Sequence, residues 1–162
     1  MRVEVAAFGK LRGPGLRDAA DHYLKLASKF VEIQERELKP LPVSDKSAAT
    51  RALVQEKEAS LLLATQKPGE RSALYLLDEG GRTLRTEQWA QLLDSWRKDG
   101  LTHVTLGLGS SLGFSPALKK QARGVLSLGP QTLPHELARV VLYEQLFRCS
   151  SLLAGHPYHI EG

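Results

Sequence analysis

Apolar and polar residues recur with two different periods along the chain, and these periods predict strands and helices in turn. Short apolar or alternating runs, which are typical of strands, occupy residues 1–8 (MRVEVAAF), 31–38 (VEIQEREL), 71–78 (RSALYLLD), 103–109 (HVTLGLG) and 125–128 (VLSL). Apolar residues at helical spacing predict helices over 16–30, from a cap at Ser44 or Asp45 to about residue 64, over 86–98 and over 134–153. Strands that alternate with helices favour an α/β fold, with a mostly parallel sheet flanked by helices.

Three loops follow predicted strands of this sheet. They are DEGGR (78–82), in which we expect a turn, GLGSSLGFSP (107–116) and LGPQTLPH (128–135). Because ligands of parallel sheets collect at the carboxyl ends of the strands, we expect a ligand site where these loops meet.

Pattern alone leaves the chemistry of the second loop open. Gly107, Gly109 and Gly113 fit either a tight turn or a cofactor loop, to which Ser110 and Ser111 would add hydroxyl donors. The spacing is G-x-G-x-x-x-G, which is not the dinucleotide-binding fingerprint.

The third loop leads into the last predicted helix. Thr132 stands at its expected N-cap and Pro134 in its first turn. This is either a well-formed helix start or a carboxylate or phosphate site, since a helix N-terminus presents free N–H groups.

The last helix is apolar on most of its surface, which a helix buried on one side does not need. Its apolar residues are Leu137, Val140, Val141, Leu142, Leu146, Phe147, Leu152 and Leu153. We therefore expect burial against its own sheet and against a partner subunit. Arg139 and Arg148 stand among these positions, either as solvated side chains or as buried or interfacial groups that face a phosphate.

The chain closes on GHPYHIEG (155–162), which crowds His156, Tyr158 and His159 around a proline. The segment is a frayed tail, half of a metal site or a docked piece of an active site. No further ligands stand at metal-site spacing, so we expect no metal. No serine-nucleophile elbow and no P-loop occur either.

Composition narrows the class of protein. The chain has 162 residues with 42% hydrophobic and 25% charged content, which fits one soluble domain over residues 1–162. Its net charge of +4 favours anionic partners such as RNA. The single cysteine excludes an internal disulfide, and neither a signal peptide nor a membrane span is evident, so we expect a cytoplasmic protein without membrane partners.

Several segments, in their order and spacing, resemble the ribosomal RNA large subunit methyltransferase H family of the knotted SPOUT superfamily. They are VAAFGKL, LLDEGG, TLGLGSSLGFSP, LSLGPQTLPHELARVVLYEQLFR and HPYH, and the resemblance covers essentially the whole chain. It implies an α/β fold with a C-terminal trefoil knot and a homodimer packed through the knotted region. It also implies the cofactor S-adenosylmethionine and methylation of N3 of a pseudouridine in 23S rRNA, in the assembled ribosome.

The resemblance also implies roles for single residues. Those that would contact the cofactor are Leu77, Gly109, Leu128, Gly129, Pro130, Gln131, Thr132 and Leu133. His156, Tyr158 and His159 match the terminal motif beside the cofactor's methyl group, and we expect His159, oriented by Tyr158, to accept the substrate proton. Arg139 and Arg148 match the helix arginines that would hold substrate, and Arg12, Lys119, Lys120 and Arg123 would hold RNA phosphates.

Two departures from the family pattern keep an alternative open. Ser110 stands where a second glycine is usual, and Ile160 stands where a basic residue often follows the last histidine. An RNA- or ribosome-binding module with lost or altered methyl transfer is therefore the second hypothesis. A nucleotide-dependent oxidoreductase is disfavoured by the missing fingerprint.

Overall fold

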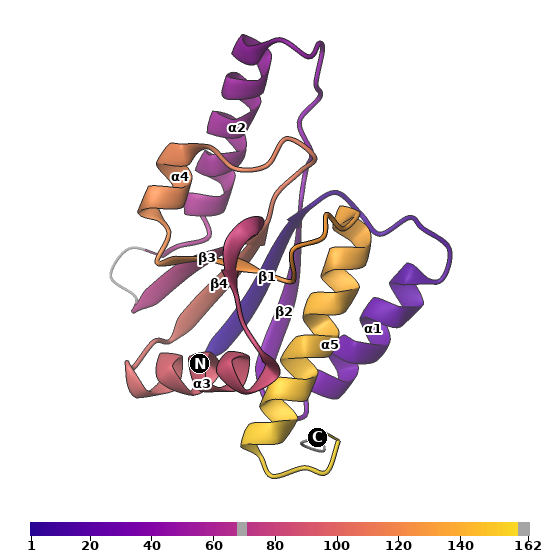
Figure 1. Ribbon diagram of the computed structural model, residues 1–162, viewed down its shortest axis with the longest axis vertical. Helices are drawn as coiled ribbons and strands as arrows, with labels where there is room; N and C mark the ends of the chain where they lie inside the picture. The colour runs from indigo at the N-terminus through magenta and orange to yellow at the C-terminus, as the bar shows by residue number, and fades with distance from the viewer. Residues whose placement is uncertain (68–70, 159–162) are drawn as a thin grey trace.

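A parallel sheet forms the centre of the computed structural model, which describes residues 1–67 and 71–158. Within these residues the strands are β1 (Arg2–Phe8), β2 (Glu32–Leu38), β3 (Ser72–Thr83), β4 (His103–Leu108) and β5 (Gly124–Ser127). They lie in the order β2-β1-β4-β3-β5, and each neighbouring pair is parallel (Figure 1). The parallel α/β sheet predicted from the sequence is confirmed.

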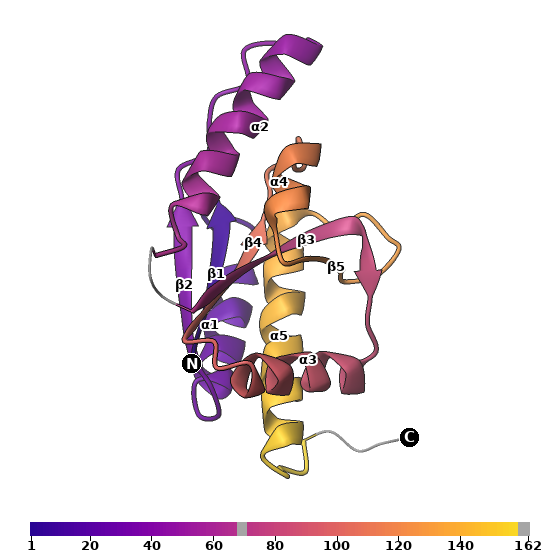
Figure 2. The same cartoon turned by 90° about the vertical axis from the view of Figure 1, so that its left-hand side faces the viewer.

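Helices cover both faces of this sheet. They are α1 (Leu16–Ala27), α2 (Ala48–Leu63), α3 (Thr86–Lys98), α4 (Pro116–Gln121) and α5 (His135–Leu153). On one face α1, α3 and α5 enclose the larger hydrophobic core, which includes Val5, Trp96 and Leu146 (Figure 1, Figure 2). On the other face α2 and α4 cover a smaller core with Phe8 and Leu62.

Helix α5 lies between α1 and α3 and packs against both (Figure 1). Leu142, Tyr143 and Leu146 are fully buried there, whereas Leu137 and Leu153 near the two ends are each 38% exposed. We had expected the apolar surface of α5 to be buried partly by the sheet and partly by a partner subunit. Much of it is instead covered within the chain, by the sheet and by the flanking helices α1 and α3.

The DEGGR segment does not end the strand as we expected but interrupts its pairing: Leu77 and Arg82 both pair with Leu126, so residues 78–81 bulge out of the ladder. Strand β3 continues through it, and its end pairs with β5 through Arg82–Leu126 and Thr83–Ser127 (Figure 1). A Cβ on Gly81 would lie 2.6 Å from the backbone carbon of Leu126, so the two segments cross in backbone contact.

Two predicted helix boundaries and one predicted N-cap are wrong, and in the first two cases another group satisfies the end of the helix. The first helix stops at Ala27, whose carbonyl accepts bonds from the N–H groups of Phe30 and Val31 as the chain turns into β2. Helix α2 is capped by Ser47, whose hydroxyl accepts the N–H of Thr50 at 3.1 Å.

The third correction concerns α5. Its N-cap is Pro134 and its first residue is His135, so Thr132 lies outside the helix. The Thr132 hydroxyl instead donates to the Glu79 carboxylate. In the described part of the chain, no helix has both the length and the apolarity of a membrane span.

Candidate functional site

Three segments meet at the carboxyl end of the sheet and surround a cavity of about 610 Å³. Strand β3 contributes Leu77, Asp78 and Glu79 where it leaves β4, and the loop after β4 contributes residues 108–114. The segment after β5 supplies Leu128, Gly129, Gln131, Thr132, Leu133, Pro134, His135 and Ala138, while Arg51 of α2 and Lys119 of α4 complete the wall. The meeting of three loops predicted from the strand pattern is confirmed.

The residues named from the resemblance as cofactor contacts gather at this cavity. Leu77, Gly109 and residues 128–133 line it, with the exception of Pro130. The size lies within the range of roughly 300–1,000 Å³ that is usual for small-molecule sites.

Two of the loops reach their shapes through glycine. Gly129 has a φ of 141°, and the Ser127 hydroxyl accepts its N–H at 3.1 Å and donates to its carbonyl at 2.7 Å. A Cβ on Gly109 would lie 3.1 Å from the Phe114 ring, which is tighter than a normal contact. Backbone therefore forms part of the wall beside Leu77 and Leu128, and such walls suit a flat heteroaromatic group recognised by backbone polar groups.

Carboxylates stand at the same cavity. Asp78 pairs with the Lys119 ammonium at 2.8 Å and accepts the N–H of Gly80 at 2.9 Å. Burial alone would raise the pKa of Asp78, but these two contacts outweigh it and hold the pKa below its ordinary value. Asp78 therefore stays ionised, and the bond from Thr132 to Glu79 ties the β3 segment to the segment after β5.

Arg139 does not face this cavity. Its side chain is fully buried, with Nη2 at 2.8 Å from Glu35 of β2 and Nη1 donating to the Gly9 carbonyl at 3.0 Å. Burial opposes ionisation of Glu35, but hydrogen bonds from Arg17, Tyr143 and Arg139 lower its pKa to about 2. The solvated form that we considered for Arg139 is wrong, and within this chain its guanidinium meets carboxylates.

Arg148, His156 and Tyr158 lie together at the C-terminal end of α5. Arg148 donates to Glu144 at 2.9 Å, and its guanidinium carbon lies 4.7 Å above the Tyr158 ring. Tyr158 packs on Phe147 with ring centroids 4.3 Å apart. The last segment is therefore docked and not frayed as far as Tyr158, whereas His159 lies outside the described residues.

The described tail residues follow the C-terminal end of α5, whereas the cavity lies at the N-terminal end of the same helix. The cavity includes His135, the first residue of α5, whereas Tyr158 follows its last turn. Nineteen helical residues span about 28 Å. Within one chain the tail and the cavity are thus separate.

Comparison with known proteins assigns the chain to a family. The model of a family described as "Predicted SPOUT methyltransferase" matches residues 1–159. Over 160 residues the chain is 38% identical to the ribosomal RNA large subunit methyltransferase H of Sinorhizobium fredii, which covers 98% of this chain and 99% of that protein. The chain belongs to the ribosomal RNA large subunit methyltransferase H family of SPOUT methyltransferases.

Other proteins of this methyltransferase family are similar to the same extent. The relative from Rhizobium leguminosarum bv. trifolii is 36% identical over 160 residues, again with 98% of this chain and 99% of the relative covered. Among solved structures, the SpoU methyltransferase AviRb from Streptomyces viridochromogenes, in complex with AdoMet, aligns with a TM-score of 0.42 and 11% identity. That alignment covers 90% of this chain and 56% of the AviRb chain.

Several residues that line the cavity of this SPOUT methyltransferase do not stand out in the sequence. Asp78 and Glu79 were seen only as part of a turn, although two carboxylates directly after a buried strand are a usable signal. Arg51 could not be recognised from the sequence. It lies on α2, between β2 and β3, and only the packing of this helix in the folded protein brings it to the cavity. Among the described residues, no group of three or more His, Cys, Asp or Glu side chains could hold a metal ion.

Proposed function

We propose that this protein transfers a methyl group from S-adenosylmethionine to N3 of a pseudouridine in 23S rRNA. The observation that carries the proposal is the gathering of Leu77, Gly109 and the 128–133 segment around one cavity of suitable size. Membership in a SPOUT methyltransferase family and the rRNA named for its relatives support the same reaction.

The cavity residues divide the work of holding the cofactor. Leu77, Leu128 and Leu133 provide apolar walls for a purine ring, while backbone groups around Gly129 would donate to and accept from its edge. Bound there, the cofactor supplies an electrophilic methyl group. The residues would then accelerate the reaction mainly by holding the methyl group in line with the substrate nitrogen, because methyl transfer is an in-line displacement.

We further propose that the working site joins two copies of the chain. Tyr158 follows the C-terminal end of α5, whereas the cavity includes His135 at the N-terminal end of this helix, which is about 28 Å long. In a two-fold dimer packed with the α5 helices antiparallel, the C-terminal end of one α5 lies beside the N-terminal end of the other. Leu137 and Leu153, exposed at the two ends of α5, would then be covered. The tail of each subunit thereby completes the cavity of its partner.

In this arrangement, tail residues handle the proton that N3 must lose. Burial and then Glu144 raise the pKa of Tyr158, so its hydroxyl stays protonated at neutral pH and acts as a hydrogen-bond donor. A neutral imidazole can accept a proton near pH 7, and we assign that role to His159. We place His156, whose ring lies 5.4 Å from Phe30, as the residue that anchors the tail.

We propose that Arg148, with Arg12, Lys120 and Arg123, meets RNA phosphates at the rim of this composite site. Arg139 would act differently, because its guanidinium is fully buried and paired with Glu35. It would fix α5 and the loop before it in place. Binding of large-subunit RNA should therefore weaken steeply with salt, whereas a flat salt response would contradict the phosphate contacts.

Mass spectrometry of rRNA nucleosides tests the reaction. RNA from cells with and without this protein should differ in one nucleoside, N3-methylpseudouridine, which is absent without the protein. Identical nucleosides from both cells would contradict the proposal and favour the RNA-binding module.

Mixed dimers test the composite site. Gly109→Val disables the cavity and Tyr158→Ala disables the tail, so each homodimer should be inactive. If the tail acts in the partner's site, a dimer of one variant with the other has one intact site and regains about half of the wild-type activity. An inactive mixed dimer would mean that cavity and tail act within one chain.

A further inference from the structure

One face of α2 is bonded to the loop after β4. Arg51, Gln55 and Glu58 follow one another at spacings of four and three residues, so they lie on the same side of the helix over successive turns. We call these three residues the α2 clasp. In Figure 1, α2 extends from the body of the protein beside the connection from β4 to α4.

The α2 clasp bonds to two residues of this loop, Ser110 and Leu112. Arg51 Nη2 and Gln55 Nε2 both donate to the Leu112 carbonyl, at 3.1 and 2.9 Å. Glu58 accepts the Ser110 hydroxyl at 2.9 Å. The loop residues that the clasp binds are thus the same ones that line the candidate cofactor cavity.

The loop after β4 has few internal restraints, so contacts from another element would help to order it. Gly109 and Gly113 stand at its two ends, and Gly113 has a φ of 67°. Glycine restricts the backbone least, so such a loop has many conformations to lose on ordering. Inside it, the backbone bond from Gly113 N to the Ser110 carbonyl, 3.1 Å long, closes a single turn.

The buried environment of Glu58 is energetically unfavourable for a carboxyl group. Its side chain is 2% exposed, and among the described residues its second carboxylate oxygen, Oε1, has no hydrogen-bond partner. Burial raises the pKa of Glu58, and the bonds from Ser110 oppose the shift only in part. A buried carboxyl group with one neutral partner destabilises a fold relative to an apolar side chain of similar shape. Stability alone therefore does not explain this residue.

We propose that the α2 clasp is a positioning element, which holds residues 110–112 in the conformation that binds the cofactor. This inference rests on the proposed function. Ser110, the departure from the paired glycines of the family pattern, becomes the residue through which Glu58 acts. The positioning residues Gln55 and Glu58 touch the loop and not the reacting atoms.

The test compares two substitutions of Glu58 with one control. Glu58→Leu removes the acceptor for Ser110, whereas Glu58→Gln retains an acceptor oxygen. Glu56→Gln makes the same chemical change at an exposed position of α2. Calorimetry with S-adenosylmethionine, thermal unfolding and hydrogen exchange of the amides of residues 110–113 are measured for each protein.

We expect Glu58→Leu to raise the Kd for S-adenosylmethionine about tenfold, the effect of one lost hydrogen bond on loop order. Its unfolding midpoint should stay equal or rise, and amides 110–113 should exchange faster without ligand. Glu58→Gln and Glu56→Gln should remain near wild type. A parallel fall in midpoint and affinity would identify a purely structural residue, and unchanged exchange with unchanged affinity would overturn the inference. If the wild type binds no S-adenosylmethionine, the proposed function fails, and ligand-free exchange still decides whether the clasp orders the loop.

Discussion

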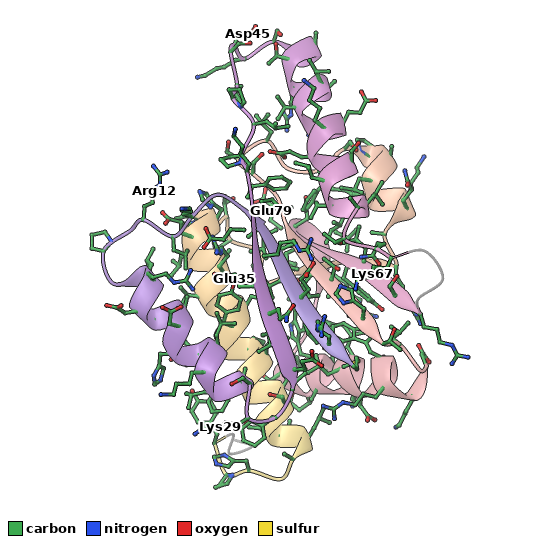
Figure 3. All side chains as sticks on the ribbon, turned by 180° about the vertical axis from the view of Figure 1, so that it is seen from behind. Arg12, Lys29, Glu35, Asp45, Lys67 and Glu79 are labelled. Atoms are coloured by element: carbon green, nitrogen blue, oxygen red, sulfur yellow. The ribbon has the colours of Figure 1, made fainter. Side chains whose placement is uncertain are left out.

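The two faces of the sheet are held in different ways. Under α1, α3 and α5 lie a large apolar core and a partly buried ion cluster, in which Glu35 meets Arg17 and the fully buried Arg139. Figure 3, seen from behind, shows Glu35 on β2 beside α5. Under α2 and α4 the core is smaller, and polar bonds from α2 hold a loop of the cavity. The first face stabilises the fold, whereas the second positions a binding loop.

This difference predicts where substitutions should unfold the protein and where they should only alter binding. A change in the ion cluster leaves a buried charge without a partner, and a change at the crossing of β3 and β5 forces backbone apart. A change in the α2 clasp removes a hydrogen bond to the loop after β4 and, at Glu58, removes a buried carboxyl group, so it should cost little or no stability. We expect the effects on stability to fall in that order.

The largest loss should follow Glu35→Gln. Arg139, which is fully buried, would keep its charge without a carboxylate at 2.8 Å, and breaking a buried pair in this way costs about 3 kcal/mol or more. Urea denaturation measures the free energy of unfolding. Glu37→Gln is the control, because Glu37 lies 3.6 Å from Arg139 and is more exposed, so its loss should be well under half as large. Equal effects would contradict a cluster centred on Glu35.

Acid should weaken the same cluster. The pKa of Glu35 is lowered from its ordinary 4.5 to about 2, so its stabilising effect is complete above about pH 4.5 and disappears as the pH falls toward 2. Between these values, the stability of the wild type should fall more steeply with pH than that of Glu35→Gln. Urea denaturation at a series of pH values gives both slopes, and parallel slopes would show that Glu35 is not the group responsible.

A loss of about 2 kcal/mol should follow Gly81→Ala at the crossing of β3 and β5. The new Cβ would lie 2.6 Å from the backbone carbon of Leu126, where no side chain can yield. Gly80→Ala provides the matched control, since its nearest atom is the Asp78 carboxylate oxygen at 3.2 Å, the end of a side chain. Thermal unfolding compares the two variants; similar midpoints would mean that the crossing is loose.

The smallest expected effect is on the reactivity of Cys149, a buried cysteine of α5. Its reaction rate measures how tightly α5 is packed, and no substitution is needed. Burial, the main cause, raises the pKa of its thiol to about 12, so the thiolate is scarce at pH 8. A thiol reagent such as DTNB should therefore react far more slowly with the native protein than with the protein in urea. Equal rates would show that α5 opens freely from the core.

The location of the site could be predicted from the sequence because it depends on local patterns. Strands that alternate with helices place the three loops at one edge, and no detail of packing is needed for that. The separation of the described tail residues from the cavity within one chain was not predicted, although the pattern contains a signal for it. The predicted helix over 134–153 starts in the third loop, so its end must lie far from that loop.

Other features could not be predicted, because distant residues decide them. Arg139 can be buried because it pairs with Glu35, which stands 104 positions earlier in the chain. Glu35 lies on the edge strand β2, and the sequence pattern does not reveal what packs beside that strand. The DEGGR segment has turn-forming residues, but β3 resumes pairing with β5 at Arg82, so the segment forms a bulge within the strand and not a turn at its end. The same holds for the α2 clasp, whose helical spacing is visible while its target is not.

We propose the cavity at the carboxyl end of the sheet as the cofactor site. Calorimetry with S-adenosylmethionine on the wild type and on Gly109→Val tests it most directly, with unfolding midpoints as a check that both proteins are folded. The account predicts saturable binding to the wild type at one molecule per subunit, and loss of binding in the variant, whose side chain fills the wall beside Phe114. A wild type that binds no S-adenosylmethionine, or a folded variant that binds it equally well, would contradict the account.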